Sequence, residues 1–154
     1  KVLVFMGLIL GFWQPKPPVG EGVTFEETAK KAENVSVVSS KDSISIGIGP
    51  ITEVSISPDI DKGLVANGEE IFKQKCVACH KIEGAFLGPA MRGVTLRRRP
   101  EWIMNMILNP NQMANEDSLA MKLFIEYDGL PMSNMGLTAK EAREVLEYFR
   151  QVDQ

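Results

Sequence analysis

The clearest periodic pattern of apolar residues lies at the end of the chain. The apolar positions there follow the spacing of one helix face, and they are Ala142, Val145, Leu146, Phe149 and Val152. The stretch Thr138-Ala139-Lys140-Glu141 just before them is a capping box, which marks the beginning of a helix. The sequence therefore predicts a C-terminal helix that turns one apolar face towards a core.

Earlier helices are predicted from weaker patterns of the same kind. Residues 63–75 carry apolar side chains at helical spacing, and Pro100 begins a helix that ends at Asn109-Pro110. Another helix is predicted from about residue 115 to residue 127, before the turn signal Asp128-Gly129. No internal repeat is present, so residues 62–154 are predicted to form one all-α domain.

The N-terminal part of the chain reads differently. Residues 1–13 are mostly apolar, a run too short to span a bilayer comfortably, so we predict the core of an export signal or a membrane anchor. Residues 14–61 are predicted to form a linker and a surface strap. Within them, residues 14–40 favour a flexible tether. The many isoleucines of residues 44–57 favour a short strand or an extended strap packed on the helical domain.

Length and charge argue against nucleic-acid binding. The chain has 154 residues, a formal net charge of −3 and 24% charged residues, as expected of a soluble globular domain. Arg97-Arg98-Arg99 is the longest basic run, and no sustained basic surface accompanies it. Nucleic acid is therefore not an expected partner.

The residues that carry chemistry are gathered in the stretch Cys76-Val77-Ala78-Cys79-His80. It contains both cysteines and the only histidine of the chain. A zinc site needs further Cys or His ligands, and a thioredoxin-like pair needs a βαβ context that the pattern lacks. C-x-x-C-H is instead the attachment site of a c-type haem, with His80 as the proximal iron ligand. We predict one haem c, bound covalently through Cys76 and Cys79.

Several motifs in order make residues 62–154 resemble the class I monohaem cytochromes c. Gly68 and Phe72 match the family's N-terminal helix, and an aromatic residue of the last helix, Tyr148 or Phe149, is implied as their partner. Gly88-Pro89 matches the segment whose proline carbonyl accepts the proton of the second ring nitrogen of His80. The resemblance implies the class I cytochrome c fold around one haem, preceded here by an extended N-terminal arm.

The sixth iron ligand is open from the residues alone, because no second histidine exists and eight methionines compete. Met113, Met132 and Met135 are predicted to lie in loops, the other candidates in the leader, the proximal loop or helices. The family motif before the last helix aligns Met132 with the ligand position, and Met135 is its rival. The family also implies that Trp102 donates a hydrogen bond to a haem propionate. We expect at most one of Arg92, Arg97, Arg98 and Arg99 to serve a propionate, because a surface arginine usually stays solvated.

These features predict a one-electron carrier rather than an enzyme, with His80 and Met132 as axial ligands. It is expected in the periplasm or on the outer face of the cytoplasmic membrane of a bacterium. The expected donor is a membrane quinol-oxidising complex, and the expected acceptor a periplasmic reductase, such as nitrous-oxide reductase, or a terminal oxidase. The alternatives are a fixed haem c subunit of a membrane respiratory complex and, less favoured, a haem-based ligand sensor or enzyme.

Overall fold

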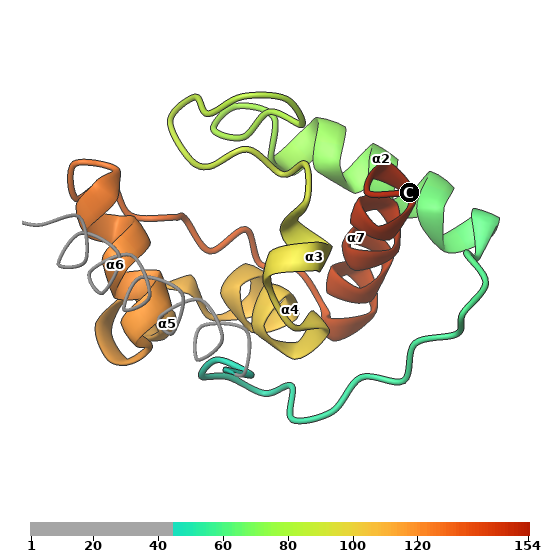
Figure 1. Cartoon of the computed structure of the whole chain (residues 1–154), viewed down its shortest axis with the longest axis horizontal. Coiled ribbons are helices and arrows are strands. Elements are labelled where there is room, and N and C mark those ends of the chain that lie inside the picture. The colour runs from blue at the N-terminus through green and yellow to red at the C-terminus, as the bar shows by residue number, and fades with distance from the viewer. Residues whose placement is uncertain (1–44) are drawn as a thin grey trace, which may run out of the picture.

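The structure, a computed structural model, describes residues 45–154 (Figure 1). Every regular element within that range is a helix, which confirms the predicted all-α class. The helices are α2 (Lys62–Lys75), α3 (Val94–Arg97), α4 (Pro100–Leu108), α5 (Pro110–Glu116), α6 (Ser118–Glu126) and α7 (Ala139–Val152). The predicted export signal or anchor and the predicted tether lie outside the described residues.

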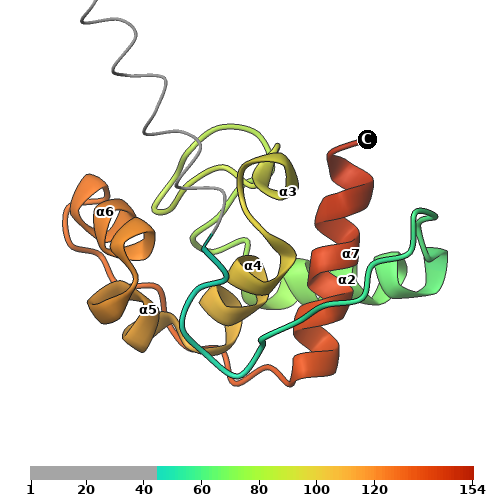
Figure 2. The ribbon, with the colours of Figure 1, turned by 60° about the horizontal axis from the view of Figure 1, so that its bottom comes forward.

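Helices α2 and α7 cross each other in close contact at one end of the molecule (Figure 2). The contact point is Gly68, where an added Cβ would lie 2.0 Å from the backbone oxygen of Glu144. One turn further on, the ring of Phe72 packs against Tyr148 and Phe149 with centroid distances of 5.6 and 5.7 Å. The predicted partnership of Gly68 and Phe72 with the last helix is therefore confirmed, and it involves both aromatic residues.

The start of α7 also follows the prediction. The hydroxyl of Thr138 accepts a hydrogen bond from the Glu141 N–H, and the Glu141 carboxylate accepts one from the Thr138 N–H. These reciprocal bonds satisfy two backbone donors that the first turn of a helix otherwise leaves unpaired. The pKa of Glu141 lies below its ordinary value, because the backbone and hydroxyl bonds from Thr138 favour the carboxylate.

The middle of the chain differs from the prediction of one helix over residues 115–127. Pro110 ends α4 and at the same time begins α5, since proline is well suited to the first helical position. Asp117 then interrupts the helix with an extended backbone and caps α6 by accepting from the Leu119 and Ala120 N–H groups. The predicted helix therefore corresponds to α6, which begins three residues later than predicted, and α5 is a further helix that the sequence did not predict.

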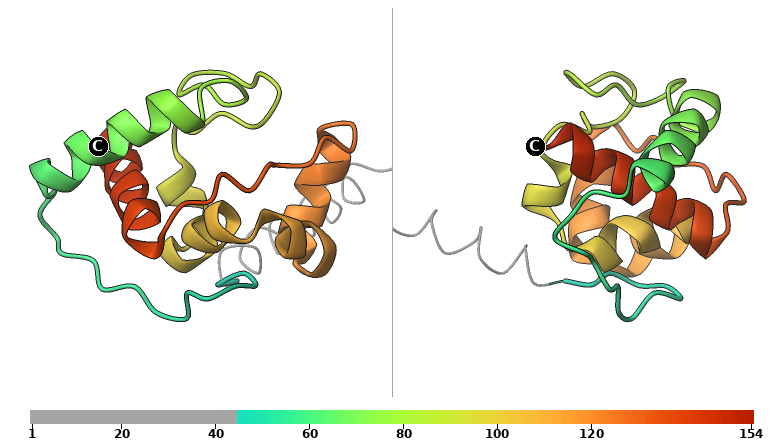
Figure 3. Two further views of the ribbon diagram at one scale, coloured as in Figure 1. Left: turned by 180° about the vertical axis from the view of Figure 1, so that it is seen from behind. Right: turned by 90° about the vertical axis from the view of Figure 1, so that its right-hand side faces the viewer.

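Residues 45–60, here called the strap, run in extended form past α4 and α7 before entering α2 (Figures 2 and 3). The described strap contains no strand. Its backbone groups are bonded instead by side chains of the helices. Its apolar side chains pack against the core, and they are Ile48, Ile51, Val54 and Ile56. The strap is thus an integral layer of the described domain.

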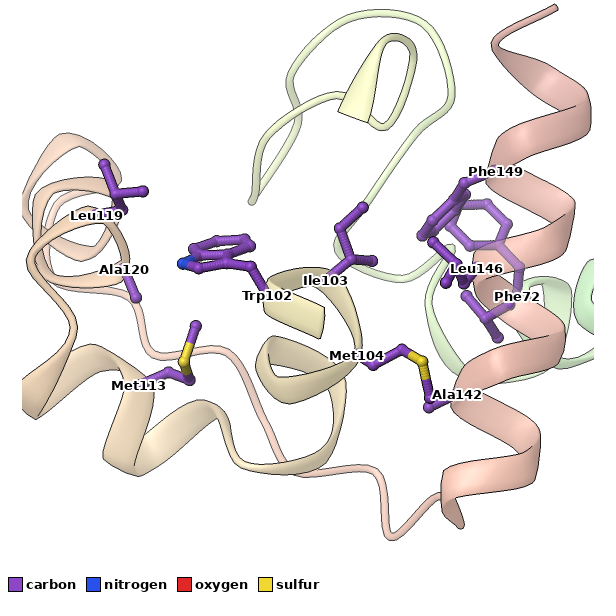
Figure 4. Packing of buried hydrophobic residues seen from close by; sticks show 11 residues of the cluster. Phe72, Trp102, Ile103, Met104, Met113, Leu119, Ala120, Ala142, Leu146 and Phe149 are labelled. Carbon is purple, nitrogen blue, oxygen red and sulfur yellow. The ribbon is translucent and has the colours of Figure 1, made fainter. Parts of the chain in front are cut away.

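The core lies between α2, α4 and α7 and extends to the α5–α6 pair (Figure 4). Its buried apolar members include Phe72, Trp102, Ile103, Met104, Met113, Leu119, Ala142, Leu146 and Phe149. Buried carboxylates border it, and each has partners. Glu147, 1% exposed, accepts hydrogen bonds from Arg143, Arg150 and the Asp61 N–H. The core therefore combines apolar packing with a few fully satisfied charges.

Candidate functional site

The two cysteines lie on a tight turn that begins where α2 ends. Cys76 is the C-cap of α2, and its backbone oxygen accepts from the N–H groups of Cys79 (3.1 Å) and His80 (2.9 Å). Both thiols are free, with Cys76 half-buried and Cys79 exposed. Burial, and then the neighbouring Cys79, raises the pKa of the Cys76 thiol to about 11. The turn therefore presents two unpaired sulfur atoms beside one imidazole.

The imidazole of His80 is held from two directions. Its Nδ1 atom lies 3.0 Å from the carbonyl oxygen of Pro89, and because a carbonyl only accepts, Nδ1 carries the proton of the neutral ring. Gly88 lies against the ring so closely that an added Cβ would come 2.6 Å from its Cε1 atom. This geometry matches the Pro89 contact that the family resemblance implies. It leaves the Nε2 lone pair of His80 available for a metal.

Backbone bonds fix the loop that carries Pro89. Gly88 donates to the Cys79 carbonyl at 3.0 Å, and Met91 donates to the Lys81 carbonyl at 3.0 Å. Arg97 adds guanidinium bonds to the carbonyls of Ala90 and Arg92. The proximal side of the site is therefore rigid, because the loop is tied both to the cysteine turn and to α3.

Met132 lies in residues 130–138, here called the ligand loop, which is irregular and leads into α7. Its side chain is half-buried, whereas Met135 is 38% exposed. The loop follows a turn in which both Asp128 and Gly129 have positive φ angles. Asn134 ties it to α4 by donating to the Leu108 carbonyl at 3.2 Å. Burial therefore ranks Met132 above Met135 as the less solvated thioether, and the ligation itself remains a prediction.

Met113 does not lie in a loop as predicted. It belongs to α5, is 0% exposed, and its sulfur accepts a hydrogen bond from the Ile48 N–H at 3.0 Å. The difference arises because Asn109-Pro110 not only ends α4 but also begins α5, since proline suits the first position of a helix. Met113 therefore acts as a core residue and as a partner of the strap.

Trp102 also has a different partner from the one implied. Its indole N–H donates to the buried carboxylate of Asp117 at 3.0 Å, and it has no second proton to give to a propionate. In this arrangement the indole proton is donated to a buried carboxylate of the chain itself, and the propionate bond that the family implies stays a prediction. The ring is instead covered by Arg98, whose guanidinium carbon lies 5.4 Å from the ring centroid.

The four arginines singled out by the sequence have unequal surroundings. Arg92 is paired with Glu83, and Arg99 with Glu101. Each ion pair raises the pKa of its guanidinium, mainly through the side-chain hydrogen bond. Arg97 and Arg98 have no carboxylate partner among the described residues. Only these two guanidinium groups retain an uncompensated charge, and they alone suit an anionic group.

Two residues of the network around Trp102 were not identified from the sequence. Asn105 is 0% exposed. Its side-chain N–H groups donate to the carbonyls of Ile46 and Ile51, and its side-chain oxygen accepts from the Ile51 N–H. Asp117 is 6% exposed and holds both Trp102 and Ser45. The available signal was a single amide inside the apolar run Trp102–Leu108, because a buried polar group needs partners.

The chemistry of this donor set fits a c-type haem. The cysteine turn supplies two free thiols for thioether bonds, and His80 supplies an oriented nitrogen whose other ring position is already bonded. A thioether lies in the ligand loop, and thioether sulfur is a suitable haem iron ligand. An all-α domain that carries such a set defines a c-type cytochrome.

Comparison with known proteins agrees with this class. The family model "Cytochrome c" matches residues 65–153, so the chain belongs to the cytochrome c family. It is similar to cytochrome c from Rhodothermus marinus, with 45% identity and a TM-score of 0.66 over 68% of this chain and 89% of that one. An engineered form of that cytochrome, bound to a carbene intermediate, is 44% identical with a TM-score of 0.63, covering 68% and 89% of the two chains.

A comparison with curated proteins found no match. Membership of the family implies a covalently attached c-type haem and a role in haem electron transfer. Cytochromes c are typically exported proteins that work outside the cytoplasm. Within the described residues, no helix has the length and apolar character needed to cross a membrane.

Proposed function

We propose that this chain carries single electrons in a bacterial respiratory chain, on a haem held axially by His80 and Met132. The observation that supports it best is the locked imidazole, with Nδ1 bonded to Pro89 and the ring backed by Gly88. A fixed proximal ring keeps the iron environment similar in both oxidation states, which lowers the reorganisation that electron transfer requires. The haem supplies the ferric–ferrous couple, and the protein supplies ligands, a dry surrounding and a docking surface.

The expected docking surface surrounds the cysteine turn. Large apolar side chains are exposed there, with Val77 at 36%, Leu87 at 47% and Phe86 at 56%. The ammonium nitrogen of Lys81 lies 5.0 Å from the centroid of the Phe86 ring, and Lys75 lies nearby in sequence, on the last turn of α2. An apolar centre with lysines beside it suits a partner whose own surface is apolar and acidic, because charge guides the encounter and apolar contact brings the redox centres close.

The proposed partners are a membrane quinol-oxidising complex as the donor and a periplasmic reductase or a terminal oxidase as the acceptor. The proposed location is the periplasm or the outer face of the cytoplasmic membrane. Retention of residues 1–13 as an anchor would restrict the search for partners to the membrane surface. N-terminal sequencing of the mature protein, purified from membranes and from periplasm, tests this part of the proposal.

The axial ligands are tested by the optical spectrum of the oxidised holoprotein. A Met–iron bond gives a weak near-infrared band, and the proposal predicts this band in the wild type and in Met135→Ala. Met132→Ala is expected to lose the band and, when reduced, to bind carbon monoxide readily. The band persisting in Met132→Ala would remove Met132 from the site. Its absence from the wild type would favour a ligand-binding haem over an electron carrier.

A fixed haem c subunit of a membrane complex is the second candidate function. It is favoured by Met121 and Ile125, which lie one turn apart on α6 and are 41% and 70% exposed. An exposed apolar pair of this kind on a surface helix suits contact with a companion subunit. Purification under mild detergent conditions separates the two candidates, because a carrier elutes alone and a subunit elutes with its companions.

A further inference from the structure

The α5–α6 pair has few attachments to the rest of the helical domain. The two helices pack on each other, and α5 packs on the end of α4, while neither has an extensive contact with α2 or α7. Figures 1 and 3 show the same arrangement, with α5 and α6 at one end of the molecule and α2 at the other. Something besides helix–helix packing must therefore keep this pair in place.

The first residues of the strap supply that attachment. Ser45 donates its hydroxyl proton to Asp117, the N-cap of α6, at 2.9 Å. Ile48 donates its N–H to the sulfur of Met113 in α5 at 3.0 Å. Between them Gly47 has a φ of +76°, and an added Cβ would lie 2.8 Å from the Met113 sulfur. Residues 45–48 together with Met113 and Asp117 are here called the clasp.

The strap that forms one half of the clasp is itself anchored on α4. Asn105 donates to the carbonyls of Ile46 and Ile51 at 2.9 and 2.8 Å and accepts from the Ile51 N–H at 2.9 Å. Asn109, at the junction of α4 and α5, adds a bond to the Ile48 carbonyl. The clasp therefore joins a fixed segment to a pair of helices whose other attachments are the α4–α5 junction, the core around Trp102 and the bond from Trp102 to Asp117.

The position of the α5–α6 pair bears directly on Met132. Helix α6 ends at Glu126, and the ligand loop begins four residues later. The far end of that loop is fixed by the Thr138 capping box of α7. In between, the side chain of Asn134 bonds the Leu108 carbonyl. Where α6 lies therefore decides where the near end of the ligand loop, and with it Met132, can reach.

We propose that the clasp positions Met132 on the iron by holding the α5–α6 pair, so that an N-terminal segment far from the haem motif controls the sixth ligand. The inference rests on the proposed His80 and Met132 ligation. Gly47, Ser45 and Asp117 are positioning residues in this account, because they act through α6 and contact no iron ligand. Loosening the clasp opens the sixth position to small neutral ligands such as carbon monoxide.

Gly47→Ala in the holoprotein is the decisive variant. The new methyl group must displace Met113 and the residue must keep a positive φ, so the clasp loosens. The matched control is Gly84→Ala, because Gly84 has a φ of +73° and nothing lies within 4 Å of its added Cβ. We expect carbon monoxide to bind reduced Gly47→Ala about tenfold faster than wild type, with a weaker near-infrared band when oxidised. Gly84→Ala is expected to match wild type in both.

Ser45→Ala is a milder variant that serves if Gly47→Ala does not fold, with the exposed Ser55→Ala as its control. It is expected to bind carbon monoxide about threefold faster, through the loss of one hydrogen bond to a carboxylate. Wild-type rates in Gly47→Ala and Ser45→Ala, with the band intact, would overturn the clasp and leave the proposed function standing. A wild type without the band would overturn the Met132 ligation and the clasp together.

Discussion

The contacts that hold the structure in place differ between the two ends of this molecule. At one end α2 and α7 meet backbone to backbone at Gly68, and aromatic rings fill the space beside the crossing. At the other end the α5–α6 pair is joined to the strap through Asp117, Met113 and a few hydrogen bonds. The first end carries the cysteine turn and His80, and the second carries the loop with Met132.

This difference predicts unequal stability within one domain. Apolar packing around a helix crossing is strong and resists local opening, whereas the partly buried hydrogen bonds of the clasp contribute about 1 kcal/mol each. Helices α5 and α6 pack mainly on each other and on the end of α4, and regions with fewer attachments open first in folded proteins. We therefore expect the half of the site that carries His80 to stay folded when the half that carries Met132 opens locally.

The largest effect is expected from Gly68→Ala, which attacks the strong end. Its Cβ would meet the backbone of Glu144 and Val145, which cannot move aside, so α2 and α7 must separate. We expect a loss of about 4 kcal/mol or more in the free energy of unfolding, measured with guanidinium chloride. Gly63→Ala in the same helix is the control, since its Cβ would approach only the Asp61 side chain. Equal stability of the two variants would refute the close crossing.

Asn105→Ala is expected to weaken the attachment of the strap at the α5–α6 end. It removes three hydrogen bonds that hold the strap to α4, at a cost of about 3 kcal/mol. Urea unfolding of the holoprotein measures the loss. Because the strap carries the clasp, the near-infrared band is expected to weaken before the helical signal does. Asn111→Ala, on the exposed side of α5, is the control, and a loss as small as that of this control would mean that the strap contributes little.

Glu147→Gln tests the joint between strap and α2, with an expected loss of about 2 kcal/mol at pH 7. Burial acts to raise the pKa of Glu147, but bonds from the Asp61 N–H, Arg143 and Arg150 outweigh it and leave the pKa below its ordinary value of 4.5. The carboxylate therefore stabilises the fold above pH 4.5, and this contribution is lost as the pH falls through the lowered folded-state pKa. Denaturant titrations over this range are expected to show the wild type approaching the variant, and a gap independent of pH would contradict the assignment.

Thr138→Ala is expected to have the smallest effect, a loss of about 1 kcal/mol from one helix cap. Thermal unfolding measures it, and Thr138→Ser, which keeps the hydroxyl, is expected to stay near wild type. The cap fixes the far end of the ligand loop, so the variant also sharpens the comparison between the two ends. A clear loss of near-infrared band intensity in Thr138→Ala, with an unfolding temperature close to that of the wild type, would show that the loop depends on α7 as well as on α6.

What the sequence predicted corresponds to contacts that are local or periodic. The C-terminal helix, its cap, the cysteine turn and the imidazole bond to Pro89 depend on residues close in sequence or on a regular spacing. The strap contacts do not, since Ser45 and Asp117 are 72 residues apart and Ile51 and Asn105 are 54 apart. Pairings of that kind depend on the complete fold, and the bond from Trp102 to Asp117 was not predicted for the same reason.

The unequal stability of the two ends is tested most directly by unfolding the wild-type holoprotein with guanidinium chloride while recording two signals. The near-infrared band reports the proposed Met132–iron bond, and the far-ultraviolet circular dichroism reports the helices. We predict that the band disappears at a distinctly lower denaturant concentration than the helical signal, because the α5–α6 end opens first. Coincident transitions would contradict the account and would mean that both ends unfold as one unit.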